Sequence, residues 1–189
     1  MILDIVKYGN PVLRKKGAHI EAITPEIKKL IADMFETMEE NHGVGLAAQQ
    51  VGVAKQLTVI DVRAATDRPS KLWLDGQEAD PADIMPLVLI NPEITPAGEP
   101  VTGGEGCLSF PEIFGDISRP GEVDVKALDA KGKPIAFRCG GLLARAVQHE
   151  TDHLNGILFI DRMDKKTKTE LQPELDTLQA ATKEELKKK

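Results

Sequence analysis

The chain has 189 residues, of which 41% are hydrophobic, and this length and composition fit one globular domain with a single core. Lys and Arg number 24 against 30 Asp and Glu, and the net charge of −6 implies no broad basic surface, which argues against nucleic acid as a direct substrate. The segment Met1–Asn10 has only short apolar stretches, interrupted by Asp4 and Lys7, and resembles neither an export signal nor a membrane span. We therefore expect a cytoplasmic protein without membrane contact, in which Cys107 and Cys139 are free thiols or metal thiolates.

The first regular element predicted along the chain is a helix. Thr24 can cap its N-terminus, Pro25 suits the first helical position, and apolar residues recur along one face as far as Met38. Gly43 is expected to end it. The spacing is that of a helix packed on a sheet, so we assign it to the core and give it no chemical role.

Two β-branched runs, Gln56–Val62 and Leu87–Ile90, are predicted strands, and the second is expected to end at the turn signal Asn91-Pro92. The segment between them, Ala64–Pro86, contains prolines, a glycine and several acidic residues without clear periodicity. This composition predicts an exposed loop or an irregular hairpin.

A hairpin and a second helix are predicted next. Residues 123–127 alternate apolar and polar side chains, and after a turn Ile135–Cys139 returns as the second strand. Gly140 and Gly141 then open a helix that runs to about Asn155.

The C-terminal segment, residues 164–189, is expected to form a docked helical tail of the single domain 1–189. Its leucines are roughly helically spaced, and Pro173 predicts a helix start or a kink. The closing Lys187–Lys189 is expected to be a solvated end, with contact to an anionic partner such as the ribosome as the alternative.

The strongest chemical pattern is His149-Glu150-Thr151-Asp152-His153, an H-E-x-x-H sequence inside the second predicted helix. Histidines at positions i and i+4 share one helix face and can bind one metal ion, while Glu150 lies close enough to act as a base on water. A surface helix that carries two histidines by chance is the alternative. The apolar stripe beside the histidines argues against it, because two buried imidazoles without partners would be costly.

A catalytic metal site needs a third protein ligand and one open position. No histidine follows His153, so the remaining candidate lies upstream in Glu105-Gly106-Cys107-Leu108-Ser109. Cys107 could present its thiolate from a strand end or a turn, although a lone cysteine can also be a core residue.

A third pattern is Gly43-Val44-Gly45-Leu46-Ala47-Ala48-Gln49-Gln50, whose small residues permit close approach of the backbone to a ligand or another segment. Taken alone it could be only a tight connection. It lacks the lysine of a phosphate-binding loop.

With these three segments together, the sequence resembles the peptide deformylase family, whose pattern is G-x-G-x-A-A-x-Q, E-G-C-x-S and H-E-x-x-H in this order. All three are intact, at Gly43–Gln50, Glu105–Ser109 and His149–His153. The similarity extends to Tyr8–Arg14 and Gly156–Phe159 and thus covers most of residues 1–163. The segment 64–86 and the tail depart from the compact family pattern but contain no motif residue.

The resemblance implies an α+β fold in which antiparallel β-sheets surround the metal-binding helix, with an N-terminal and a C-terminal helix. It implies that Cys107, His149 and His153 bind one divalent ion per chain. Ferrous iron is implied as the physiological metal, whereas nitrogen and sulfur ligands by themselves suit zinc, nickel or cobalt equally well.

The implied reaction is hydrolysis of the N-formyl group from the N-terminal formylmethionine of nascent polypeptides. By similarity, Glu150 accepts a proton from the attacking water and then protonates the departing amine, so that formate is released. The side-chain amide of Gln50 and the backbone N–H of Leu108 are implied to stabilise the oxyanion.

Substrate binding is expected to use backbone pairing and an apolar pocket. Val44, Gly45 and Leu46 could pair with the peptide as an added strand. Leu142 and Ala146 lie on the helix face of His149 and are candidate walls of a methionine pocket.

Two questions stay open at this level. Glu105 and Arg119 could form an ion pair that steadies the Cys107 loop, or they could be solvated separately, and Asp152 could orient the site or face solvent. The rival functions are a general metallopeptidase and a binding module with a purely structural metal. The latter would require a fourth ligand, for which Cys139 is the only spare cysteine.

Overall fold

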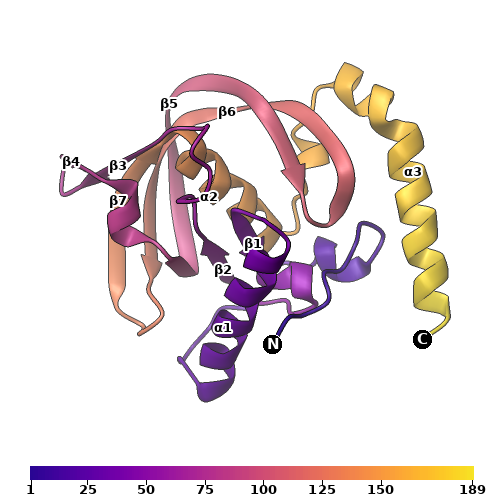
Figure 1. The fold of residues 1–189 in the computed structure, drawn as a ribbon, viewed down its shortest axis with the longest axis horizontal. Coiled ribbons are helices and arrows are strands. Elements are labelled where there is room, and N and C mark those ends of the chain that lie inside the picture. Colours follow the sequence, from indigo (N-terminus) through magenta and orange to yellow (C-terminus); the bar gives the residue numbers. More distant parts are fainter.

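The computed structural model describes residues 1–189 as an α+β fold with three α-helices and one seven-stranded antiparallel sheet (Figure 1). The strand order is β1-β2-β5-β6-β7-β3-β4, so β1 and β4 are the edges. The predicted class is confirmed, with one continuous sheet instead of several. The strands are β1 (Gly45–Ala47), β2 (Leu57–Ile60), β3 (Ser70–Leu74), β4 (Gln77–Ala79), β5 (Leu87–Cys107), β6 (Phe110–Leu128) and β7 (Pro134–Gly140), and the helices are α1 (Pro25–Glu40), α2 (Gly141–Leu154) and α3 (Lys165–Lys187).

The predicted N-terminal helix is α1, and its start is as expected. The Thr24 hydroxyl accepts a hydrogen bond from the Ile27 N–H at 3.2 Å, and Pro25 occupies the first turn. The apolar stripe is buried against β1 and β2. The helix ends at Glu40, earlier than the predicted Gly43, because Asn41 leaves the helical conformation and its side chain donates back to the Thr37 carbonyl.

The predicted end of a strand at Asn91-Pro92 is wrong, because β5 continues to Cys107. Asn91 has a left-handed φ of 51°, and the register of β5 against β6 shifts between Ile90 and Glu93. The turn signal is therefore accommodated as a bulge inside a long strand. Beyond Ile90 this strand pairs only with β6, and a strand that is unpaired on one side tolerates proline.

The segment 64–86 contains the hairpin β3–β4, the second of its two predicted alternatives. β3 pairs with β7 and so extends the sheet. Leu72, in the middle of β3, is fully buried in the core under α2. Residues 64–86 therefore contribute to the sheet and the core of the domain and are not only a surface loop.

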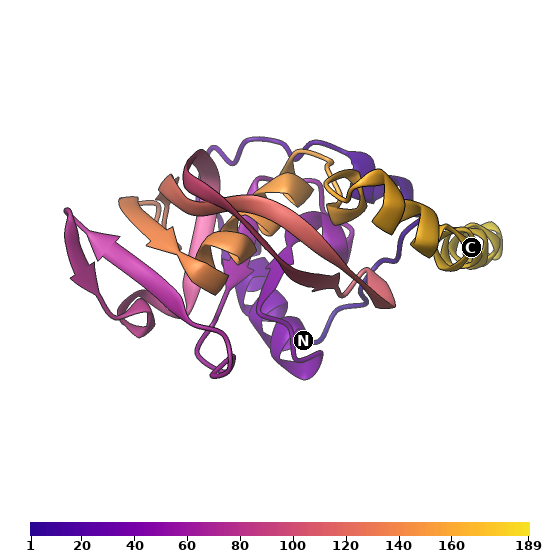
Figure 2. The ribbon, with the colours of Figure 1, turned by 90° about the horizontal axis from the view of Figure 1, so that it is seen from above.

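Helix α2 is the central element, and the sheet curves around it (Figures 1 and 2). Every residue from Leu142 to Leu154 is buried, including the polar ones. The start of the helix is fixed by the Leu142 N–H, which donates to the Pro69 carbonyl at 2.9 Å. Gly156, with a φ of 75°, follows its C-terminal end as predicted.

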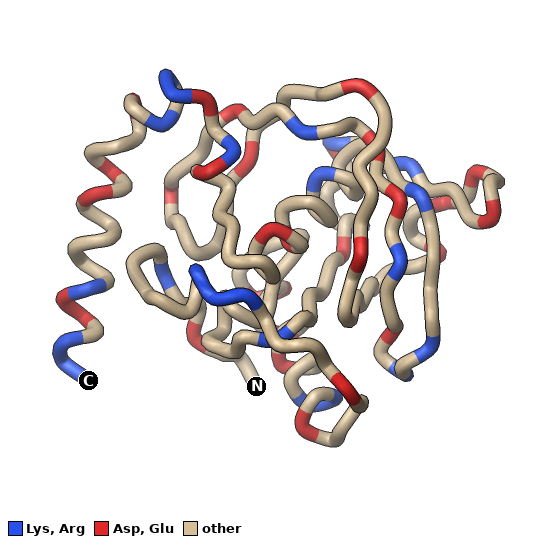
Figure 3. Tube along the Cα trace, turned by 180° about the vertical axis from the view of Figure 1, so that it is seen from behind, with Lys and Arg blue, Asp and Glu red and all other residues tan.

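Helix α3 lies at the end of the molecule opposite β4 (Figures 1 and 2). Asp164 caps it, accepting from the Thr167 N–H, so the helix starts well before Pro173, which lies inside it. Leu175 is buried in a cluster with β6. Along α3, basic residues gather at both ends with acidic residues between them, and over the rest of the chain the two signs are mixed (Figure 3). None of the three helices combines the length and apolarity needed to cross a membrane.

Leu72→Ala tests whether the β3–β4 hairpin belongs to the core. Removal of a fully buried leucine side chain is expected to lower the free energy of unfolding by about 2–5 kcal/mol. Lys71→Ala, at the exposed neighbouring position, is the matched control and should change it by less than about 0.5 kcal/mol. Urea denaturation measures both. Equal midpoints for the two variants would contradict the role of Leu72 in the core.

Candidate metal centre and its pocket

Three side chains that can bind a metal converge where the end of β5 meets α2. The ligand atoms of Cys107, His149 and His153 all lie within 4.8 Å of one another. The sulfur of Cys107 is 3.4 Å from Nε2 of His153. Cys107 is the last residue of β5, as expected for a thiol presented from a strand end, and the two histidines project from the same face of α2.

The chemistry of these donors fits a divalent ion. Both imidazoles are buried, with exposures of 8% for His149 and 1% for His153. Burial lowers the pKa of His153 well below its ordinary value, so this imidazole is neutral, which is the form that binds metals. Its Nδ1 atom is buried and has no hydrogen-bond partner in the protein, whereas Nε2 points to the thiol.

Glu105 orients the other imidazole. Its Oε1 atom lies 2.8 Å from Nδ1 of His149. Burial alone would raise the pKa of Glu105, but hydrogen bonds from His149 and Arg119 outweigh it and hold the pKa well below its usual range. A carboxylate can only accept, so the Nδ1–H donates and Nε2 remains free to bind a metal.

Two buried arginines surround the same carboxylate. Arg119 donates from Nε and Nη2 to Glu105 at 2.6 and 2.9 Å, and Arg145 donates from Nη1 at 2.7 Å. Arg119 also reaches Asp152 at 2.9 Å, and Asp152 accepts two further bonds from Arg162. Glu105 and Arg119 therefore form an ion pair and are not solvated separately. Asp152 holds Arg119 instead of facing solvent.

Glu150 lies on α2 next to the ligands and is 5% exposed. Burial raises the pKa of its carboxyl group to about 7. Its Oε2 atom has no hydrogen-bond partner in the protein. Gly45 permits the close approach of β1, because a Cβ atom there would lie 2.8 Å from Oε1 of Glu150.

Two residues with hydrogen-bond donors, Gln50 and Leu108, line the pocket beside Cys107. The Gln50 amide is oriented by the Ala47 N–H, which donates to Oε1 at 3.0 Å. Its Nε2 atom therefore points to Cys107, with Sγ 3.5 Å away, and to the Ser109 hydroxyl at 3.3 Å. The N–H of Leu108 makes no hydrogen bond within the protein.

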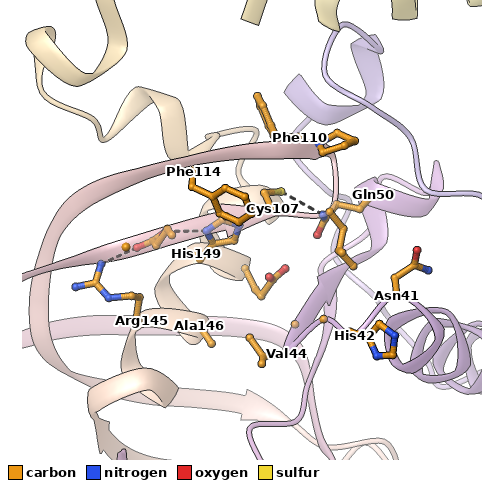
Figure 4. Close-up of a pocket in the computed structure, with 18 of the residues that line it drawn as sticks. Asn41, His42, Val44, Gln50, Cys107, Phe110, Phe114, Arg145, Ala146 and His149 are labelled. Atoms are coloured by element: carbon orange, nitrogen blue, oxygen red, sulfur yellow. Dashed lines mark hydrogen bonds and ion pairs between the residues drawn. The ribbon is translucent and has the colours of Figure 1, made fainter. Parts of the chain in front are cut away.

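A pocket of about 540 Å³ opens beside the three ligands (Figure 4). Val44, Leu142 and Ala146, which the sequence suggested as contacts, are among the residues that line it. Sequence reasoning missed Arg145 and Phe114 as members of this site. Arg145 is one helical turn before His149, a signal that could have found it, whereas nothing in the sequence marks Phe114.

The free edge of β1 forms one side of the pocket. The Asp61 N–H donates to the Val44 carbonyl, and the Leu46 carbonyl accepts from the Thr58 hydroxyl, so both residues face β2. Because alternate residues of an antiparallel strand face opposite sides, Gly45 directs its N–H and C=O to the unpaired edge. Leu46 does not line the pocket, since its side chain is fully buried in the core under α1.

An H-E-x-x-H helix and a strand-borne cysteine, converging beside a pocket in an α+β fold, define a single-metal hydrolase type of site. Comparison with known proteins gives the particular family. The model of the polypeptide deformylase family matches residues 2–169, and the chain belongs to this family.

Other peptide deformylases are similar to this chain in sequence and in structure over most of their length. The peptide deformylase of Opitutus terrae is 47% identical over 186 residues, which cover 97% of this chain and 96% of that protein. The peptide deformylase of Methylacidiphilum infernorum is 46% identical, with coverage of 94% and 93%. The crystal structure of the Legionella pneumophila peptide deformylase superposes with a TM-score of 0.79 at 35% identity, covering 96% and 97%. The Synechococcus elongatus peptide deformylase, solved in complex with actinonin, gives 0.74 at 39% identity, covering 95% and 85%.

Glu105→Gln tests whether the carboxylate orients His149. The substitution weakens the acceptor at Nδ1, and loss of such a contact is expected to reduce zinc affinity by about 10- to 100-fold. Competition with a chelator measures it, on protein shown by circular dichroism to be folded. Asp124→Asn is the matched control on β6, since this exposed carboxylate pairs with Arg138 away from the site. Unchanged zinc affinity in Glu105→Gln would contradict the role of Glu105.

Proposed function

We propose that the chain removes the N-formyl group from the N-terminal formylmethionine of nascent polypeptides by metal-dependent hydrolysis, releasing formate. The observation that carries this proposal is the convergence of a three-ligand site, the Glu150 carboxyl group and a free strand edge on one pocket. Family membership supports the same reaction.

Cys107, His149 and His153 would hold one divalent ion per chain, which we propose to be Fe²⁺. The same nitrogen and sulfur donors accommodate Zn²⁺, Ni²⁺ or Co²⁺. When bound, the ion supplies Lewis acidity, which polarises the formyl carbonyl and makes water acidic enough to act as a nucleophile near neutral pH.

Glu150 is proposed to move the proton. A carboxyl group whose pKa lies near 7 can exist as the carboxylate that accepts a proton from water and as the acid that returns it to the departing amine. Burial makes this dual role possible, because water does not stabilise the charged form. The partnerless Oε2 atom supports the role, since no protein group competes for it.

Gln50 and Leu108 are proposed to stabilise the oxyanion that develops on the formyl oxygen. The Gln50 Nε2 donor is fixed through Oε1, and the Leu108 N–H is unused within the protein. Donors that are oriented in advance stabilise developing charge without reorganisation.

The peptide is proposed to bind as an added strand on β1, pairing with the outward N–H and C=O of Gly45. Its methionine side chain would enter the apolar part of the pocket formed by Val44, Leu142 and Ala146. Leu46, also suggested by the sequence, is left out because its backbone groups face β2.

The structure disfavours a purely structural metal. Such a site would need a fourth protein ligand. Cys139, the spare cysteine, is fully buried in the core at β7, burial raises the pKa of its thiol to about 12, and it is not part of the ligand cluster.

Nascent chains in the cytoplasm are the proposed partners. The lysine-rich end of α3 could contact an anionic partner such as the ribosome, as the alternative to a fully solvated end. Its Lys187 ammonium lies 3.9 Å from the Glu184 carboxylate, so the basic charge there is partly offset within the helix.

Formate release identifies the reaction. Formyl-Met-Ala-Ser should release formate, whereas an internal peptide bond of an unformylated peptide should stay intact. Acetyl-Met-Ala-Ser should be slower by at least roughly 10²-fold in kcat/KM, because the methyl group would displace the carbonyl from its donors by about 1 Å. Equal rates for formyl and acetyl peptides, or internal cleavage without formate, would overturn the proposal.

Glu150→Gln separates the base from the ligands. The amide retains the size of the side chain but cannot accept a proton, so kcat should fall by at least about 10²-fold while the metal content stays at the native level. Glu112→Gln is the matched control, since Glu112 is an exposed carboxylate on the rim of the same pocket. It should leave kcat close to the native value. Native turnover in Glu150→Gln would remove Glu150 from its role.

A further inference from the structure

Phe114 is the most exposed of the large hydrophobic side chains, with 70% of its surface accessible, and it lines the pocket beside the metal ligands. Cys107 and His149 line the same pocket, and the close-up draws all three side chains together (Figure 4). A phenylalanine in water at the mouth of a pocket leaves apolar surface that a ligand could cover.

Residues on the opposite face of β6 fix the position of the Phe114 ring. Ile113 and Ile117, on the other face of β6, are buried in the cluster beneath α3. Gly115 packs against the start of α3, since a Cβ there would lie 2.8 Å from the terminal methyl of Met163 and 3.1 Å from the methyl of Thr167. Because neighbouring residues of a strand point to opposite faces, this packing directs Phe114 to the pocket.

Gly106 lies close to the Phe114 ring. A Cβ atom at Gly106 would lie 2.6 and 2.7 Å from two ring carbons of Phe114, so only glycine allows the ring to rest on β5. Much of the remaining ring surface is open to solvent, since Phe114 is 70% exposed. The ring is thus held against β5 and exposed at the edge of the pocket.

We infer that Phe114 is a specificity-determining residue, whose exposed ring packs against the thioether of the substrate methionine. The inference rests on the proposed function and identifies the thioether sulfur as the feature of the substrate that the pocket recognises. The sulfur of a thioether is polarisable and makes favourable contacts with aromatic rings, which a methylene group of similar size does not match. Phe114 therefore makes the pocket distinguish methionine from norleucine, its isostere, which shape and apolarity alone would accept equally.

The test compares kcat/KM for formyl-Met-Ala-Ser and formyl-norleucine-Ala-Ser, with the metal held constant. The native chain should prefer methionine by roughly two- to tenfold, the range that a single sulfur–aromatic contact supplies. Phe114→Leu retains an apolar side chain without a ring, so the preference should disappear. Phe114→Tyr retains the ring and should preserve it.

Val101→Ala is the control for loss of an exposed apolar side chain on the same hairpin, because Val101 is 53% exposed and does not line the pocket. It should leave the preference unchanged. A native ratio near one, or a ratio in Phe114→Leu equal to the native one, would overturn the inference. Absence of formate from both peptides with the native chain would instead overturn the proposed function, so the two failures are distinguishable.

Discussion

The buried carboxylate of Glu105 is the interaction on which the rest of the site depends. It accepts hydrogen bonds from His149, Arg119 and Arg145 and thereby joins β5, β6 and α2 at one point. Burial of each ion costs several kcal/mol of lost hydration, which only a fully paired arrangement offsets. Since removal of one partner leaves an unpaired charge in the interior, this network favours the arrangement of β5, β6 and α2 in which all partners meet.

This constraint has an electrostatic consequence for the neighbouring groups. The network satisfies one imidazole through its Nδ1 atom, while burial keeps His153 neutral and raises the pKa of Glu150 to about 7. The same exclusion of water therefore acts on both groups. In the proposed mechanism, the neutral His153 imidazole would bind the cation and the Glu150 carboxyl group would transfer a proton in both directions.

Local patterns in the sequence predicted those helix and strand boundaries that depend on residues a few positions away along the chain. The Thr24-Pro25 start of α1, the glycine start of α2 and the turn between β6 and β7 all depend on backbone preferences within a few positions. The extension of β5 past Asn91 could not be predicted in this way. The Asn91 side chain bonds the distant backbone of Ile20, and partners far along the chain decide such a bulge.

The sequence by itself determined that two potential metal ligands lie together, because i, i+4 spacing on a helix places His149 and His153 on one face wherever that helix lies. The tertiary structure alone decided which distant groups meet them. It brought Glu105 and Arg119 together, turned Gly45 to a free strand edge with Leu46 facing the core, and placed Phe114 at the pocket mouth. These contacts join segments far apart along the chain, and their geometry follows from strand register and helix packing, which no local pattern of residues encodes.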